Sequence, residues 1–347
     1  MPDTFAAERD RETLAKIKEQ LRMLPPFCAE FFRGISATTL PLTRYGYALD
    51  LRVFFTFLVD EFPPLAGKTI HELTLADIAR VASSTIEEYL DYLTYGTRDG
   101  EVFENHDRGK ARKLSSLRAF YRYFCKNGKL PANVAAIVDA PKLREQPITR
   151  LEPNEVANLL DMAENGAHLT EKQRQFHQRT RVRDVAILTL FLGTGIRISE
   201  LVGLNMGDVD FDANAFRVTR KGGKGAVLYF GDEVREALLR YFIERKELVA
   251  QPGSENALFL SLQSRRLSTR AVQNLVEKYA QPAVPLKHIS PHKQRSTYGT
   301  MLYHETGDIY LVADVLGHND VNTTRKHYAA QKDENRRRAA RVVKLRE

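Results

Sequence analysis

Cysteine and long apolar runs are both scarce in this sequence. Its 347 residues include two cysteines, Cys28 and Cys125, each beside a phenylalanine, which disfavours a disulfide scaffold and predicts two core thiols. Nowhere do about 18 apolar residues follow one another, and the first residues, MPDTFAAERDRETLAKIKEQL, lack the apolar stretch of a secretory signal. These absences predict a soluble, cytoplasmic protein that does not enter a membrane.

The sequence also lacks a Walker-type glycine loop and a cluster of acidic metal ligands. We therefore expect chemistry that needs no cofactor, neither a nucleotide nor a metal. The formal net charge of +8 and the pI of about 9.3 weakly favour a polyanion as partner.

The length suits two domains, and the patterns change along the chain. In the first part, helical spacing of apolar residues predicts an all-α bundle over residues 1–140, with stripes at Tyr47, Leu51, Phe54 and Leu58 and at Leu114, Leu117, Tyr121 and Phe124. The proline-rich, charged residues 141–152 predict an exposed linker.

Residues 153–331 mix helical and strand patterns, which predicts an α+β domain. Val182–Phe191 is nearly all apolar and predicts a buried helix, while Ala215–Thr219 and Ala226–Phe230 predict a strand hairpin around KGGKG. The polar, Gln- and His-rich segment Asn165–Thr180 is expected to be a surface insertion. The fold class expected is mainly α with a small antiparallel sheet, and residues 332–347 form a basic tail.

Four separated motifs, TGIRISEL, TRKGGKG, SPHKQR and VLGHNDVNTTRKHY, carry the residues for phosphodiester chemistry. Cleavage without a metal needs cations for the phosphate oxygens, a nucleophile, and an acid for the leaving alkoxide. Arg197 and Arg295 are candidates for a phosphate clamp, since planar guanidinium groups bind two oxygens at once. Lys221 beside two glycines is the candidate acid, and Tyr328 the candidate nucleophile, because cationic neighbours favour the phenolate.

Three of these motifs, in this order, resemble the catalytic boxes of the tyrosine recombinases, the Xer-like integrase family. TGIRISEL is similar to the first arginine box, SPHKQRSTYGTML to the His-x-x-Arg box, and LGHNDVNTTRKHY to the closing histidine and nucleophile segment. The resemblance covers residues 151–330 well and the N-terminal part weakly, as a helical core-binding domain. Gln294 and Ser296 depart from the family's second box.

The resemblance implies a site-specific DNA recombinase that acts through a 3′-phosphotyrosine and a Holliday junction, in mobile-element integration and excision or in Xer-type dimer resolution. The implied partners are double-stranded DNA with a specific recombination site, three further copies of the chain in a homotetramer, and an accessory or second recombinase protein. The implied location is the nucleoid. The implied catalytic residues are Arg197, Lys221, His292, Arg295, His318 and Tyr328, with Glu200 in support.

DNA contacts are also expected outside these boxes. A basic set around one predicted helix suits a phosphate-tracking surface, and Lys224 flanks the hairpin glycines. Two basic domains joined by a linker suggest a clamp around the duplex, and in the family the tail docks on a neighbouring protomer. The basic set is Arg108, Lys110, Arg112, Lys113, Arg118 and Arg122.

Several alternatives remain open. Lys224 competes with Lys221 for the hairpin role, Glu200 could be an ordinary helical partner of Arg197, and Tyr298, Tyr303 and Tyr310 are other phenols nearby in sequence. A type IB topoisomerase-like relaxase would use the same chemistry as a monomer. An inactive DNA-binding accessory protein would fit the altered second box.

Overall fold

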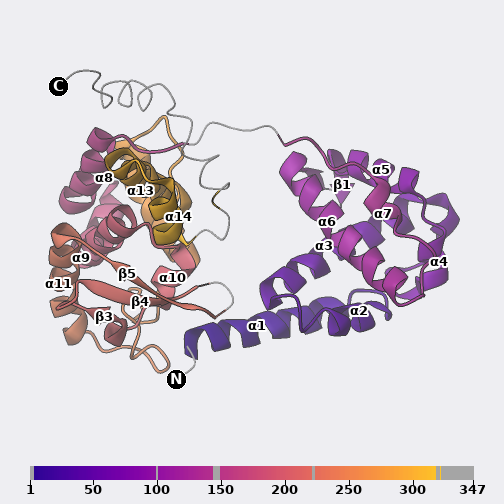
Figure 1. The fold of residues 1–347 in the computed structure, drawn as a ribbon, viewed down its shortest axis with the longest axis horizontal. Helices are drawn as coiled ribbons and strands as arrows, with labels where there is room; N and C mark the ends of the chain where they lie inside the picture. The colour runs from indigo at the N-terminus through magenta and orange to yellow at the C-terminus, as the bar shows by residue number, and fades with distance from the viewer. Residues whose placement is uncertain (1–3, 99–100, 144–148, 221–222, 318–320, 322–347) are drawn as a thin grey trace, which may run out of the picture. The chain divides into compact units, whose positions relative to one another are not determined.

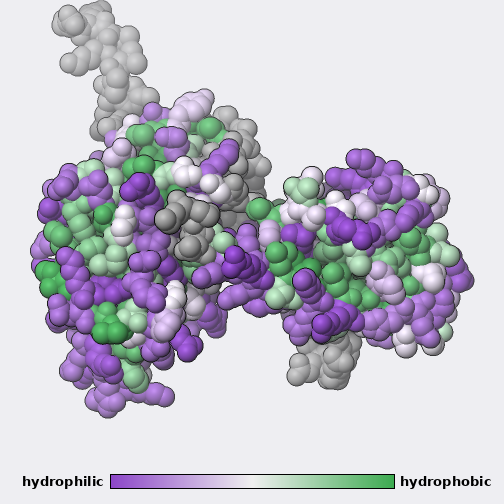
Figure 2. Space-filling model, turned by 90° about the horizontal axis from the view of Figure 1, so that it is seen from below, coloured by the Kyte–Doolittle hydropathy of each residue, from purple (hydrophilic) through white to green (hydrophobic). Residues whose placement is uncertain are grey.

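The computed structural model describes residues 4–98, 101–143, 149–220, 223–317 and 321. It divides into two compact units, residues 1–145 and 146–347, which are described separately. On the face seen in Figure 2, hydrophilic residues cover most of each unit, with smaller groups of hydrophobic residues between them. Among the described residues, no helix is both long and apolar enough to cross a membrane.

The first unit is a helical bundle with one short strand hairpin, by which it departs from the predicted all-α bundle (Figure 1). Its core is rich in aromatic rings, and Phe31, Phe54, Phe120 and Phe124 are fully buried. The predicted stripes are confirmed, because α3 and α6 turn them into this core. The elements are α1 (Thr4–Leu21), α2 (Cys28–Gly34), α3 (Pro41–Glu61), η1 (Pro63–Leu65), η2 (Ile70–Glu72), α4 (Leu75–Ala79), α5 (Ser83–Tyr92), β1 (Tyr95–Arg98), β2 (Glu101–Glu104), α6 (Asp107–Lys126) and α7 (Val134–Ile137).

The second unit wraps helices around α9 and carries a small antiparallel sheet of order β3-β4-β5 (Figure 1). Ile187, Leu188, Leu190 and Phe191 of α9 are fully buried, which confirms the predicted apolar helix. The elements are α8 (Pro153–Asn165), α9 (Glu171–Thr194), α10 (Ile198–Gly203), η3 (Met206–Asp208), β3 (Val209–Asp210), β4 (Ala215–Thr219), β5 (Gly225–Tyr229), α11 (Asp232–Glu247), α12 (Thr269–Ala283), α13 (Pro291–Thr306) and α14 (Ile309–Leu316).

The predicted hairpin is confirmed, with Ala215 opposite Tyr229 and Thr219 opposite Gly225. Its second strand begins one residue earlier than expected. The mainly helical fold with a small antiparallel sheet is therefore the one that the sequence predicts.

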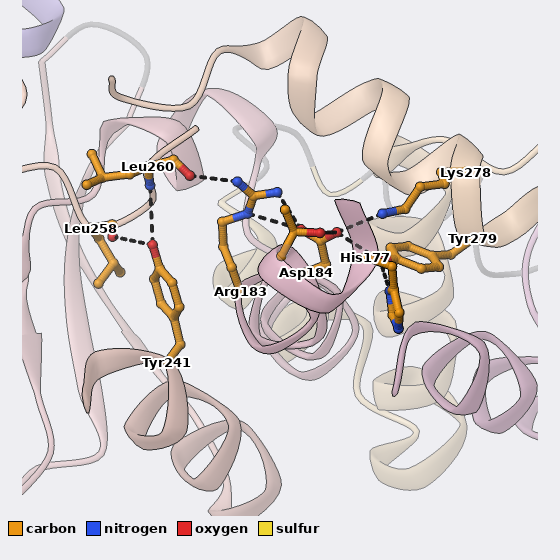
Figure 3. Close-up of polar contacts among 9 residues, drawn as sticks. His177, Arg183, Asp184, Tyr241, Leu258, Leu260, Lys278 and Tyr279 are labelled. Atoms are coloured by element: carbon orange, nitrogen blue, oxygen red, sulfur yellow. Dashed lines mark hydrogen bonds and ion pairs between the residues drawn. The ribbon is translucent and has the colours of Figure 1, made fainter. Parts of the chain in front are cut away.

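The segment Asn165–Thr180, expected to be a surface insertion, is mostly exposed, but from Glu171 onward it belongs to α9 and is not an insertion. Thr170 caps α9 through its side-chain oxygen, and the helix begins at Glu171. His177 and Thr180 are buried, and both bond to other buried polar groups. His177 bonds to the Tyr279 hydroxyl (Figure 3), and Thr180 donates to the Asp184 carboxylate. A polar sequence therefore forms the first turns of a central helix.

Candidate active site

Arg197 lies where the central helix ends and the chain turns into α10. Gly195 caps α9 with φ of 61°, a left-handed conformation that favours glycine, and Arg197 then precedes α10 in an extended conformation. The buried Glu200 carboxylate accepts hydrogen bonds from the Arg197 backbone N–H at 3.0 Å and from its Nη1 at 2.9 Å. Both the backbone and the guanidinium of Arg197 are thereby fixed by one carboxylate.

Arg295 reaches the same place from α13. It is 5% exposed and donates from Nη1 to the Gly195 carbonyl and from Nη2 to the Leu316 carbonyl. Arg197 Nη2 donates to the next carbonyl, that of Gly317, at 2.8 Å. Two arginines about a hundred residues apart in sequence therefore meet at the C-terminal end of α14.

Sequence reasoning missed a third arginine at this helix end. Arg220 directly follows β4, and its Nη2 donates to the Val315 carbonyl at 2.9 Å. Its place beside Lys221 was the signal available in the sequence. We call Arg197, Arg220 and Arg295, with the carbonyls of residues 315–317, the arginine cluster.

The arginine cluster gathers three guanidinium groups at the end of a helix. A helix C-terminus carries roughly half a negative charge, which attracts guanidinium groups. Glu200 forms an ion pair with Arg197, whereas Arg220 and Arg295 bond to neutral carbonyls. A guanidinium has five N–H donors in a planar fork, a geometry that suits an anion such as a phosphate.

The other predicted catalytic residues divide into described and undescribed ones. His292 is exposed in the first turn of α13, one turn before Arg295. Lys224 is exposed beside β5, and its carbonyl accepts from the Arg220 backbone N–H at 2.8 Å. Lys221, His318 and Tyr328 lie outside the described residues.

Gln294 and Ser296, the two residues that depart from the family's second box, are both buried. Gln294 is fully buried, and neither its amide oxygen nor its amide nitrogen has a hydrogen-bond partner within the described part of the chain. Ser296 is also buried, and its hydroxyl donates to the His292 carbonyl at 3.1 Å. Ser296 thus bonds within its own helix, whereas the buried amide of Gln294 has no partner in the described part of the chain.

The predicted DNA-contact set on α6 divides in two. Arg118 donates to the carbonyls of Ala135 and Val138, and the buried Lys113 donates to Asn105, so these two hold the fold together. Lys110 is half-buried and donates to a threonine hydroxyl, and Arg112 pairs with the buried Asp50 while remaining exposed. Arg108 and Arg122 are exposed as well. Arg118 and Lys113 donate to the unit's own oxygens, and DNA contact by the whole set stays a prediction.

A cluster of buried polar residues lies in the second unit, around Asp184 of α9 (Figure 3). Asp184 is 1% exposed and accepts from Arg183, Lys278 and Tyr279. Burial opposes the charged carboxylate, but the positive charges of Arg183 and Lys278 outweigh it and hold the pKa of Asp184 below its ordinary value. We call His177, Thr180, Arg183, Asp184, Lys278 and Tyr279 the Asp184 cluster.

Two tyrosines of this unit are poor nucleophiles in their present environment. Burial, followed by the negative charge of Asp184, raises the pKa of Tyr279 far above its ordinary value. Burial also raises the pKa of Tyr298, which packs with Tyr303 and Leu302 against Val312 and Leu316. Neither phenol is placed to ionise near neutral pH.

Comparisons with known proteins assign the family. The phage integrase family matches residues 149–335. The tyrosine recombinase XerC of Chlorobaculum tepidum is 30% identical over 305 residues, covering 85% of each chain. That of Caldanaerobacter subterraneus subsp. tengcongensis is 32% identical over 312 residues, covering 86% of this chain and 82% of the relative.

Solved structures share the fold. A Tn1549 transposon integrase in complex with circular intermediate DNA has a TM-score of 0.65 and 20% identity, covering 91% of this chain and 99% of that one. The XerH site-specific recombinase bound to its difH substrate has a TM-score of 0.62 and 20% identity, covering 85% and 79%.

The fold and the family match define a tyrosine recombinase. The chain belongs to the phage integrase family and is a Xer-like enzyme of site-specific recombination. The predicted family, fold class and enzyme class are confirmed.

Proposed function

We propose that this recombinase acts on double-stranded DNA at a specific site, and that Arg197 and Arg295 clamp the phosphate that is cut. The observation that carries the proposal is the meeting of both guanidinium groups on adjacent carbonyls, Leu316 and Gly317. Those carbonyls directly precede His318, which begins the segment leading to Tyr328. The DNA complexes of the structural relatives support the choice of partner.

The proposed cleavage is a transfer of the phosphoryl group to tyrosine. After the Tyr328 phenol has lost its proton to solvent, its oxygen forms a bond to phosphorus and the bond from phosphorus to the 5′ oxygen breaks. The electron pair stays on the 5′ oxygen, which takes a proton from the Lys221 ammonium. The products are a 3′-phosphotyrosine and a free 5′-hydroxyl, and a 5′-hydroxyl of the partner duplex reverses these steps.

The remaining residues have supporting roles in this proposal. His292 and His318 bind or orient the phosphate, and Glu200 fixes Arg197 through its two hydrogen bonds. The first unit contacts DNA phosphates through the exposed Arg108, Arg112 and Arg122. Four copies act on paired sites within the nucleoid, with residues 332–347 docking on a neighbouring copy.

Covalent trapping tests this function. The binding site is first selected from a library of randomised duplexes with the Tyr328→Phe variant, which binds without cutting. A nicked version of that duplex is then incubated with the wild-type chain in EDTA, so that loss of the short product traps the phosphotyrosine. We expect an adduct with the wild type and none with Tyr328→Phe.

Two outcomes would redirect the proposal. Equal binding by both proteins without any adduct favours a DNA-binding accessory protein. An adduct without joint products between two differently labelled duplexes, but with relaxation of supercoils, favours a topoisomerase-like enzyme.

A further inference from the structure

The side chain of Arg220 links the turn between β4 and β5 to α14. Arg220 closes the turn through its backbone, since its N–H donates to the Lys224 carbonyl at 2.8 Å and its carbonyl accepts from Gly223 at 3.1 Å. Its side chain leaves the sheet and donates to the Val315 carbonyl at 2.9 Å. Arg220 therefore connects the hairpin to the helix end that Arg197 and Arg295 bind.

The Arg220 guanidinium packs against Gly317, in a space that a larger residue at this position would fill. Gly317 has φ of 60°, and a Cβ built on it would overlap the Arg220 guanidinium, so the absence of a side chain at 317 makes the close contact possible. The Nε atom of Arg220 is buried and has no hydrogen-bond partner in the described part of the chain. A buried donor without a partner is costly, so packing against α14 must offset that cost.

We infer that Arg220 is a positioning residue: it anchors the end of β4 to the helix end that Arg197 and Arg295 bind, and Lys221 is the next residue along the chain. This inference rests on the proposed function, in which Lys221 is the general acid. Its physical basis is that a general acid must come within hydrogen-bond distance of the leaving oxygen. A lysine side chain is long and flexible, so an anchor on the residue before it limits the volume that the ammonium explores.

A change of leaving group separates this role from a structural one. Replacing the bridging 5′ oxygen with sulfur gives a thiolate leaving group, which is much less basic than an alkoxide and departs without protonation. A defect that acts through the general acid is therefore relieved by sulfur, whereas a defect in the phosphate clamp is not. Single-turnover cleavage of the selected duplex is measured with oxygen and with sulfur at this position.

We expect Arg220→Ala to cut the oxygen duplex about 100-fold more slowly than the wild type, the cost of a misplacement of about 1 Å. On the sulfur duplex it should come within a few-fold of the wild type, as should Lys221→Ala. Arg197→Ala should remain slow on both duplexes. Arg217→Ala removes an exposed cation from the same strand and should stay near the wild-type rate on both.

Arg220→Lys guards against a folding defect. It keeps the charge but loses the planar fork that bonds to Val315, so it should show a smaller defect that sulfur also relieves. The inference is overturned if Arg220→Ala is equally slow, relative to the wild type, on both duplexes, or if it matches the wild type on oxygen. A wild-type chain that forms no adduct on either duplex instead refutes the proposed function itself.

Discussion

The second unit contains two clusters of cations, which differ in the groups that accept their hydrogen bonds. In the Asp184 cluster, Arg183 and Lys278 both bond to one buried carboxylate. In the arginine cluster, Arg220 and Arg295 bond to backbone carbonyls, and a carboxylate pairs with Arg197. A buried carboxylate holds the first cluster together, whereas the second gathers at the backbone carbonyls of a helix end.

We use this difference to separate a structural role of the Asp184 cluster from the proposed catalytic role of the arginine cluster. A carboxylate held by two cations and a phenol has little capacity left for a ligand, and it ties α9 to α12 (Figure 3). Guanidinium groups gathered at a helix end have the planar donor geometry that suits phosphate oxygens. Breaking the first cluster should therefore change stability, and breaking the second should change the rate of cleavage.

The largest effect is expected in the Asp184 cluster. Asp184→Asn removes the buried charge but keeps the shape, leaving Arg183 and Lys278 without their counter-charge. We expect the free energy of unfolding to fall by about 3–5 kcal/mol, the usual cost of breaking a buried ion pair. Urea unfolding monitored by hydrogen exchange of peptides from α9 and α12 measures this for the second unit alone.

A surface pair in the same unit provides the control. Glu236 and Arg240 form an ion pair on α11 with side chains 66% and 64% exposed. Glu236→Gln should change the free energy of unfolding by less than about 0.5 kcal/mol. Similar losses for both variants would show that the Asp184 cluster is no more structural than an exposed pair.

In the arginine cluster the expected effect is on catalysis. Arg295→Ala and Arg197→Ala should each slow covalent adduct formation by on the order of 10²–10³, the usual cost of losing one preorganised donor. Affinity for the selected duplex should change far less, because many phosphate contacts remain. A cleavage rate within a few-fold of the wild type would remove that arginine from the proposed clamp.

Local patterns in the sequence predicted the elements that depend on them. The apolar run at Val182–Phe191 and the strand pair around KGGKG were found because burial and turn chemistry act over a few residues. The burial of His177 in the first turns of α9 was missed. It depends on Tyr279 and Asp184, which no local pattern connects to His177. Tertiary contacts bury His177 and Thr180 within a polar segment that is otherwise mostly exposed.

The site shows the same limit. The motifs identified Arg197 and Arg295, since box chemistry and order can be recognised without coordinates. Arg220 was missed because its role depends on Gly317 and Val315, about a hundred residues further along the chain. The bonds of Arg118 and Lys113 to oxygens of their own unit were also missed, because a helical face of basic residues does not reveal which oxygens lie beside it.

Gln294 differs from both clusters, because it is a buried polar residue whose amide has no partner in the described part of the chain. Gln294→Leu removes these two unpaired polar atoms from the residue next to Arg295. We expect the free energy of unfolding to rise by about 1–3 kcal/mol, the cost of burying such groups, while the cleavage rate stays within a few-fold. Gln294→Ala, which leaves a cavity, should gain less. A loss of stability in Gln294→Leu would indicate that the amide has a stabilising role.

The smallest effect concerns the protonation of His177 at the edge of the Asp184 cluster. Because Tyr279 donates its hydroxyl proton to Asp184, its oxygen accepts from His177 Nδ1, at 3.0 Å. Burial, followed by the positive charge of Lys278, lowers the pKa of His177, while Asp184 raises it by less. The folded chain therefore takes up this proton less readily than the unfolded chain does, and the neutral ring contributes stability above the unfolded value of about 6.5.

As the pH falls from about 7.5 to about 5.5, this contribution should be lost, starting near the unfolded pKa. His177→Gln keeps a donor toward Tyr279 but cannot titrate, so its stability should fall less than that of the wild type, by a difference of about 1 kcal/mol or less. His288→Gln changes an exposed histidine of the same unit and serves as the matched control. Urea unfolding at the two pH values measures the difference, and parallel losses in the wild type and His177→Gln would place the pH sensitivity of this cluster on another group.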